Sequence, residues 1–155
     1  MNSKLRMPGP RYAALIQLLR TAENLWNASR IFFDKWDLSP SQFNILNVLH
    51  HQSEGCTQSE LSRELITHRS NVTGLVDRLE ERGLVCRRDS ATDRRAWRVA
   101  LTPKGRELLE EILPEYYGEA ERLWGNIPAS QASKLASELS ALCGQIEKFG
   151  SGGLN

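Results

Sequence analysis

The sequence lacks the long apolar runs that mark membrane proteins. Its 155 residues contain no stretch approaching the roughly 20 apolar residues that a bilayer-spanning helix needs. The first basic residues, Lys4 and Arg6, are not followed by the apolar core of a secretory signal. We therefore expect a cytoplasmic protein that has no membrane partner.

The chain contains few cysteines and few histidines, three of each. Cys56, Cys86 and Cys143 are odd in number and widely spaced, which suits neither a disulfide framework nor a zinc site with paired ligands. The three histidines lack a neighbouring set of carboxylate or thiolate ligands. We predict reduced, ordinary thiols and no bound metal or cofactor. Redox sensing by one thiol stays open. It would require a thiol whose pKa is lowered.

Signatures of catalysis are also missing. The sequence shows no nucleophile elbow, no phosphate-cradling glycine loop and no metal-ligand spacing. Glutamates such as Glu110 and Glu111 are explained more simply as the solvated face of a helix. The sequence therefore predicts that the protein is not an enzyme.

The charge of the chain is nearly balanced overall but uneven along its length. The formal net charge is +1. Residues 1–62 carry 6 basic and 5 acidic side chains, residues 63–106 carry 11 and 6, and residues 107–155 carry 3 and 8. The middle segment is thus at +5 and the last segment at −5. A locally basic segment is typical of a surface that binds nucleic acid.

Apolar residues at steps of three and four predict long helices at both ends of the chain. One helix is expected from Leu15 to about Asp37, another from Thr102 to about Trp124, and a last one over 135–149. Their apolar faces are wide enough to pack against more than a small middle domain. Burial against a second copy of the chain is the simplest solution; helices that fold back on their own domain are the alternative.

The middle of the chain predicts shorter elements. Ser39 and Thr57 each begin a capping box, the pattern that starts a helix. A fourth helix over 72–79 has apolar residues at i, i+3, i+4 and i+7 and ends at a glycine suited to a left-handed cap. The runs 84–88 and 97–101 are β-prone and flank a polar, turn-rich segment. They predict a two-stranded hairpin.

The fourth predicted helix has short polar side chains on its outward face. In a helix-turn-helix protein such residues face base edges and phosphates in the major groove; a solvated polar face is the alternative. Asn71 is suited to adenine, Arg69 to guanine or phosphate, and the Thr73 methyl group to thymine. Gly74 lowers helix stability but would let the backbone approach a sugar or phosphate. The predicted contacts of this helix are His68, Arg69, Ser70, Asn71, Thr73, Gly74 and Arg78.

Arginine is concentrated at the predicted hairpin. Arg94 and Arg95 lie at its tip, flanked by further arginines, and their repulsion would be relieved by an anionic partner. A narrow minor groove attracts such a side chain, and Asp93 can orient one guanidinium group through a bidentate contact. The predicted DNA contacts of the hairpin are Arg87, Arg88, Asp93, Arg94 and Arg95.

The hairpin also carries a family signature. Residues 93–105 reproduce without a gap the wing pattern D-x-R-x-x-x-V-x-L-T-x-x-G of the MarR (multiple antibiotic resistance regulator) family, through Asp93, Arg95, Val99, Leu101, Thr102 and Gly105. Residues 70–83 resemble the recognition helix of that family. The resemblance extends from about Leu38 to Gly105, and the flanking helices agree in placement only.

The resemblance implies a homodimer that binds a pseudo-palindromic operator in double-stranded DNA. The first, fifth and sixth helices would form the dimer part, and each subunit would offer one winged helix to the DNA. Position by position, Ser70, Asn71 and Thr73 fall on the base-reading turn and Arg78 on a phosphate contact. Arg95 falls on the minor-groove arginine, braced by the aspartate two residues before it.

Many members of the family respond to small phenolic or other aromatic ligands lodged between the dimer part and the DNA-binding lobe. Candidates for such a pocket here are Trp26, Arg30, His50 and His51. A core tryptophan and surface histidines explain the same residues more simply. One branch of the family senses peroxide through a cysteine in its first helix, where this chain has none.

The expected fold is mainly α-helical with a small β-hairpin wing: a winged helix-turn-helix domain over residues 38–105, flanked by dimerisation helices over 1–37 and 106–155. The expected function is that of a homodimeric, sequence-specific transcriptional regulator. Repression, relieved by a small ligand, is favoured over activation because the sequence shows no extra domain for recruiting polymerase. The alternative is a winged-helix module that contacts an acidic protein and does not read DNA.

Overall fold

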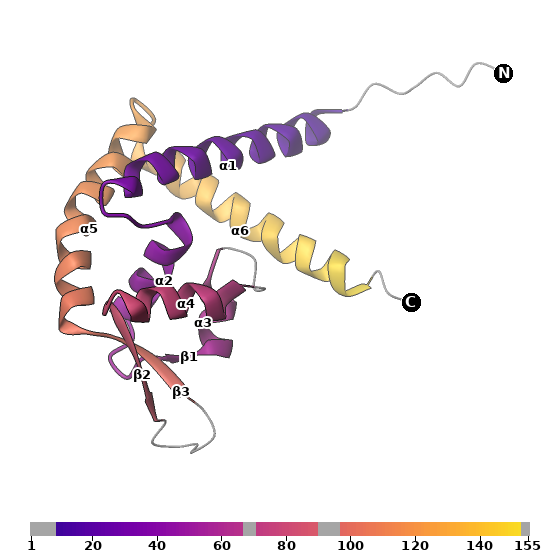
Figure 1. The fold of residues 1–155 in the computed structure, drawn as a ribbon. Coiled ribbons are helices and arrows are strands. Elements are labelled where there is room, and N and C mark those ends of the chain that lie inside the picture. Colours follow the sequence, from indigo (N-terminus) through magenta and orange to yellow (C-terminus); the bar gives the residue numbers. More distant parts are fainter. Residues whose placement is uncertain (1–8, 67–70, 90–96, 153–155) are drawn as a thin grey trace. The chain divides into compact units, whose positions relative to one another are not determined.

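The structure is a computed structural model that describes residues 9–66, 71–89 and 97–152. The described residues are mostly helical and include a small antiparallel sheet (Figure 1), which confirms the predicted fold class. The elements are α1 (Pro10–Asp34), α2 (Pro40–His50), β1 (Cys56–Thr57), α3 (Gln58–Glu64), α4 (Val72–Glu81), β2 (Val85–Asp89), β3 (Trp97–Leu101), α5 (Pro103–Trp124) and α6 (Ala129–Gly152).

The chain divides into two compact units, residues 1–109 and 110–155. The first unit contains the elements from α1 to β3 and the beginning of α5. The second contains the rest of α5 and α6. Across the ranges that the structure describes, no helix combines the length and apolarity required to span a membrane.

Two capping boxes begin α2 and α3, as predicted. The Gln42 N–H donates to Ser39 Oγ at 3.2 Å, and the Ser39 N–H donates to Gln42 Oε1 at 2.8 Å. Thr57 and Glu60 repeat the arrangement at 3.2 and 2.7 Å. The hydrogen bonds from the backbone and side chain of Thr57 lower the pKa of Glu60, so the carboxylate that closes this box stays ionised.

One face of α4 is buried in the core of the first unit. Val72, Leu75, Val76 and Leu79 each expose 7% or less of their surface, as their spacing predicted. The helix packs against α2, α3 and β2. Burying one such side chain stabilises the fold by about 1.5 to 3 kcal/mol, whereas a glycine within a helix costs about 1 kcal/mol. The helix therefore forms despite Gly74.

A glycine cap ends α4, also as predicted. Gly83 has a φ of +69°. Its N–H donates to the Glu80 carbonyl at 2.8 Å, and the Leu84 N–H donates to the Leu79 carbonyl at 2.9 Å. This pair of bonds forms a Schellman motif, which favours glycine because side chains are strained at positive φ. The motif leads the chain directly into β2.

The sheet has one strand more than the predicted hairpin. β2 and β3 pair antiparallel, with Val85 opposite Leu101 and Asp89 opposite Trp97, which confirms the hairpin. On the other side of β3 lies β1, with Cys56 opposite Val99. Two residues are too few to show an alternating pattern, so β1 could not be predicted from the sequence. The hairpin extends beyond α3 and α4 at its outer end (Figure 1).

The end of the wing signature, Thr102 and Gly105, has a structural explanation. Thr102 Oγ1 accepts the Gly105 N–H at 3.0 Å and donates to the Gly83 carbonyl at 2.6 Å, which ties the start of α5 to the end of α4. A Cβ atom at Gly105 would lie 2.0 Å from the Leu84 carbonyl oxygen. Close packing of two backbones therefore requires glycine at this position.

Candidate nucleic-acid interface

The first turn of α4 presents short polar side chains to solvent. Asn71 occupies the N-cap position, and Thr73 follows it within the first turn; both are exposed. Arg78, further along the helix, is exposed as well. These residues lie outside the buried apolar stripe of α4, as is required of side chains that are predicted to contact DNA. The predicted contacts His68, Arg69 and Ser70 lie outside the described residues.

Gly74 provides space for a neighbouring side chain. A Cβ atom at this position would lie 2.8 Å from Asn71 Oδ1. The Asn71 side chain makes no capping hydrogen bond to the helix. The expected role of Gly74 was to let a DNA backbone come close. The structure adds a reason within the protein, since the missing Cβ makes room for the Asn71 carboxamide group.

Arg87 has carboxylate partners within the protein, which the sequence did not predict. Its guanidinium group forms ion pairs with Asp77 and Glu80 of α4, and its backbone N–H donates to Glu80 Oε1 at 3.0 Å. The hydrogen bond to Asp77 is the main cause of a raised Arg87 pKa, against the opposing effect of burial. These contacts join β2 to α4.

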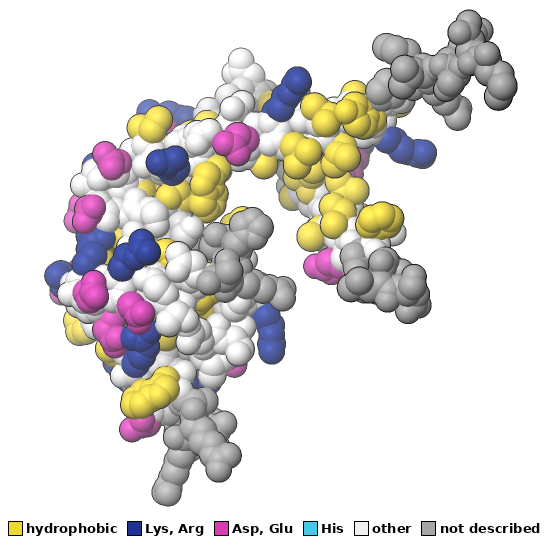
Figure 2. Space-filling model, turned by 45° about the vertical axis from the view of Figure 1, so that its right-hand side comes forward, with side chains coloured by type: hydrophobic (Ala, Val, Ile, Leu, Met, Phe, Trp, Pro, Cys, Tyr) yellow, Lys and Arg dark blue, Asp and Glu magenta, His cyan; other side chains and the backbone are white. Residues whose placement is uncertain are grey.

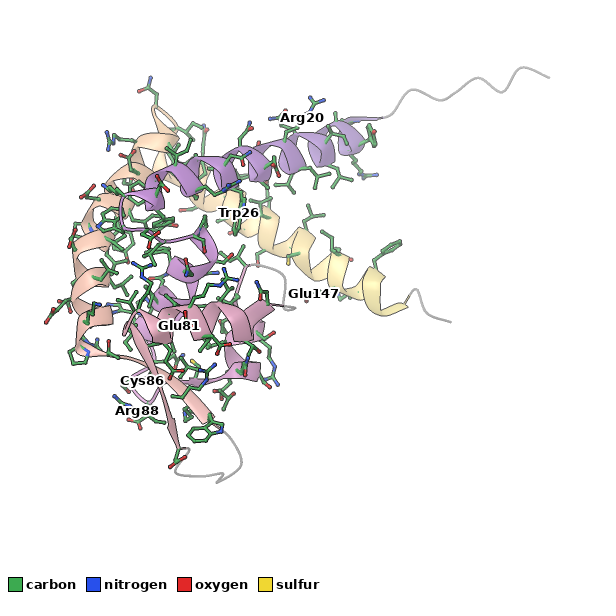
Figure 3. The ribbon with its side chains drawn as sticks, in the orientation of Figure 1. Arg20, Trp26, Glu81, Cys86, Arg88 and Glu147 are labelled. Carbon is green, nitrogen blue, oxygen red and sulfur yellow. The ribbon has the colours of Figure 1, made fainter. Side chains whose placement is uncertain are left out.

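The other flanking arginines of the hairpin differ in their surroundings. Arg98 donates to the carbonyl oxygens of Glu54 and Gly55 at 3.1 and 2.7 Å and lies 3.4 Å from a Glu60 carboxylate oxygen. Arg88 is exposed and projects outward from β2 (Figure 3). Of these described arginines, Arg88 is the one placed to meet a ligand in solvent. The predicted tip residues Asp93, Arg94 and Arg95 lie outside the described residues.

Replacing Arg87 with alanine is expected to destabilise the fold by about 1 to 2 kcal/mol, because two carboxylates lose their shared partner. For a chain of this length the melting temperature should fall by about 3 to 6 °C. Thermal unfolding followed by circular dichroism measures the change. Arg88→Ala is the matched control on the same strand, and its effect should stay within about 0.5 kcal/mol. Equal melting temperatures for both variants would contradict the structural role of Arg87.

A cavity of about 440 Å³ lies where the end of α1 meets the start of α2. Two of the predicted pocket residues, Trp26 and Arg30, line it; His50 and His51 are not among its lining residues. The rings of these histidines instead contact each other edge to face, with centroids 5.3 Å apart. The structure thus brings together only half of the predicted set. The described residues that line it are Trp26, Arg30, Asp34, Asp37, Leu38, Ser39, Pro40, Ser41 and Gln42.

Arg82 connects the wall of this cavity to the end of α4. Its guanidinium group donates to the carbonyl oxygens of Trp36, at 3.0 Å, and Asp37, and lies 3.8 Å from the Asp37 carboxylate. Asp37 has a φ of +53°, a left-handed conformation that non-glycine residues seldom adopt. Because Asp37 also lines the cavity, Arg82 joins the cavity wall to the end of α4 through one side chain.

The geometry of the sheet argues against a disulfide between Cys56 and Cys86. The strand β3 separates β1 from β2, so the two cysteines are at least two strand spacings, about 9.6 Å, apart. A disulfide requires Cα atoms within about 7 Å.

Burial is the main cause that raises the pKa of the Cys56 thiol, and a raised pKa disfavours the reactive thiolate. Cys143 is exposed on α6.

The helices α1 and α6 each expose a series of large apolar side chains (Figure 2). On α6 they recur at alternating steps of four and three and expose from 37% to 85% of their surface. Exposed apolar patches of this kind mark interaction surfaces. The residues are Tyr12, Leu15, Leu19, Leu25, Trp26 and Ile31 on α1, and Leu135, Leu139, Leu142, Ile146 and Phe149 on α6.

Comparison with known proteins links this geometry to a family of regulators. The MarR family model matches residues 36–96. The transcriptional repressor MprA of Escherichia coli (strain K12) is 33% identical over 113 residues, which cover 72% of this chain and 64% of MprA. The match thus spans just under two thirds of MprA. YhbI of Bacillus subtilis (strain 168), an uncharacterized HTH-type transcriptional regulator, is 33% identical over 146 residues that cover 85% of this chain and 95% of YhbI.

Solved structures show the same fold. The transcriptional repressor CouR bound to a 23-mer DNA duplex superimposes with a TM-score of 0.77 at 27% identity, covering 91% of this chain and 99% of CouR. CouR from Rhodococcus jostii RHA1 bound to p-coumaroyl-CoA gives a TM-score of 0.74 at 27% identity, covering 81% of this chain and 88% of CouR. The same fold therefore occurs in a repressor solved once with DNA and once with a small molecule.

Proposed function

Because the chain belongs to the MarR family of transcriptional regulators, we propose that it is a homodimeric, sequence-specific DNA-binding repressor, without catalytic activity, that a small ligand releases from its operator. The observation that carries the proposal is the polar first turn of α4 within the same compact unit as an arginine-rich hairpin. A recognition helix and a basic wing together provide contacts to adjacent grooves of one duplex.

In this proposal α4 enters the major groove with its N-terminal turn. Asn71 and Thr73 contact base edges, and Arg78 contacts a phosphate group. The residues before the helix, His68, Arg69 and Ser70, complete the contact by their position in the sequence. The exposure of the three described side chains supports these roles, as does the CouR complex with DNA.

In the wing, Arg95 enters the minor groove and Asp93 orients its guanidinium group, while Arg94 and Arg88 contact the phosphate backbone. The exposed position of Arg88 supports its role. We assign Arg87 a different role, which is to hold β2 against α4 through its two carboxylate partners. The ion pairs of Arg87 therefore attach the DNA-contacting wing to the recognition helix.

We propose that the apolar faces of α1 and α6 are buried against a second copy of the chain. Large exposed apolar side chains on both helices, which on α6 recur at regular steps, support this assignment, because burial would remove their contact with water. A two-fold dimer presents two recognition helices. The operator is then a pseudo-palindrome whose half-sites are centred about 10 base pairs apart, or a multiple of that distance.

For the effector we propose a small aromatic molecule with an acidic group, bound in the cavity beside Trp26 and Arg30. The indole ring offers a stacking surface, and the guanidinium group offers a partner for a carboxylate or phenolate. The route by which such a ligand weakens DNA binding is the Asp37 turn, which lines the cavity and holds Arg82 at the end of α4. The CouR complex with p-coumaroyl-CoA, a ligand that carries an aromatic ring, supports the aromatic part of this proposal.

The test is the affinity for a duplex selected from a random pool, measured by fluorescence anisotropy. Arg95→Ala should weaken binding by about 1 to 3 kcal/mol while the dimer stays intact. Arg20→Ala removes an exposed arginine from α1 and should leave the affinity unchanged. Equal affinity of the Arg95 variant and the wild type would remove the wing from the mechanism. A wild type that enriches no duplex would favour the module that contacts an acidic protein.

A further inference from the structure

A side chain outside the recognition helix contacts one of its base-reading residues. Gln58, the first residue of α3, donates a hydrogen bond from its side-chain amide to Thr73 Oγ1 in the first turn of α4. Both side chains are exposed. We infer that Gln58 is a specificity-determining residue that fixes which part of the Thr73 side chain faces the DNA; this inference rests on the function proposed above.

The physical reason lies in the two chemically different branches of threonine. In a helix the threonine side chain divides its time between two rotamers, which point the hydroxyl and the methyl group in different directions. A hydroxyl group can bond to any base, whereas a methyl group packs selectively against the methyl of thymine. By holding Oγ1 on the side of α3, Gln58 selects one rotamer. The methyl group then takes a fixed direction.

Gln58 is itself held in place from two sides. It follows directly after Thr57, whose capping box with Glu60 fixes the first turn of α3. Thr57 also pairs with Arg98 in the sheet, and Arg98 contacts the Glu60 carboxylate at 3.4 Å. The amide group of Gln58 therefore extends toward α4 from a backbone that is anchored to β3. A donor anchored in this way can orient Thr73 before DNA binds.

The test measures discrimination between sequences rather than affinity alone. The wild type, Gln58→Ala, Thr73→Val and the double variant are each titrated with the selected operator and with operators in which single T·A pairs are replaced. Gln58→Ala should reduce discrimination about threefold to tenfold at one position of each half-site, the worth of about one methyl contact. In the Thr73→Val background the same substitution should change nothing, because the hydroxyl group that it acts through is absent. Gln52→Ala, which removes an exposed amide outside α3, is the control.

Two results would overturn the inference while leaving the proposed function intact. Gln58→Ala could lower the affinity for every operator by the same factor, which would indicate only a structural or phosphate contact. Its effect on discrimination could also persist at full size in the Thr73→Val background, which would show that Gln58 reads DNA without Thr73. A wild type that binds no selected duplex would contradict the proposed function, and this inference with it.

Discussion

Replacing Leu139 and Leu142 of α6 with glutamate is expected to convert the proposed dimer into a monomer and to lower the operator affinity at least about 100-fold. The two leucines expose 37% and 40% of their surface in the single chain. In the proposed dimer this surface is buried, and a carboxylate there would lose its hydration without gaining a partner. A monomer engages one half-site only and loses the gain in affinity that comes from joining two weak contacts.

Sedimentation velocity gives the mass of each variant, and anisotropy gives its affinity for the operator. The matched control introduces two glutamates elsewhere on α6, as Ser137→Glu and Ser140→Glu, which are exposed and lie away from the apolar stripe. The control should remain a dimer with the affinity of the wild type. A leucine variant that stayed dimeric would place the interface elsewhere. A monomeric variant that bound the operator as tightly as the wild type would show that binding does not depend on the dimer.

Gly105→Ala is expected to destabilise the fold by about 3 kcal/mol or more, the upper range for overpacking a tight site. The added Cβ atom would lie 2.0 Å from the carbonyl oxygen and 2.9 Å from the carbonyl carbon of Leu84. That carbonyl group accepts the Thr102 N–H at 3.1 Å. Because both obstructing atoms belong to the backbone, relief requires the connection between the wing and α5 to open.

The corresponding fall in melting temperature is about 6 to 12 °C for a chain of this size. Differential scanning calorimetry measures it, and Gly118→Ala serves as the control on the same helix. A Cβ atom at Gly118 meets no heavy atom within 4 Å, so this change should be neutral or stabilising by up to about 1 kcal/mol. Similar melting temperatures for the two variants would show that Gly105 is not a packing requirement.

The parts of the fold that were predicted correctly depend on interactions between residues close together in the sequence. The capping boxes at Ser39 and Thr57 span three residues, and the Schellman cap at Gly83 ends a stripe that repeats within two turns of α4. Such signals need no knowledge of distant contacts. Helix ends are harder to predict: α1 begins at Pro10 rather than Leu15, because proline suits the first turn of a helix.

The features that sequence could not show depend on residues brought together from different elements. The strand β1 exists only because β3 pairs with it. Arg87 looked like one more wing arginine, since its partners Asp77 and Glu80 lie on another element. Chemistry alone groups His50 and His51 with Trp26, whereas the described cavity is formed around the turn between α1 and α2. Contacts of this kind require the fold to be known.

The salt dependence of duplex binding tests the central claim most directly, because a protein that neutralises phosphates releases counterions from DNA. The affinity of the wild-type dimer for its selected operator should fall by a factor of about 10³ to 10⁵ between about 50 and 200 mM salt, as expected for six to ten phosphate contacts. An affinity that stays nearly constant across this range would contradict a DNA interface built on α4 and the arginine-rich wing.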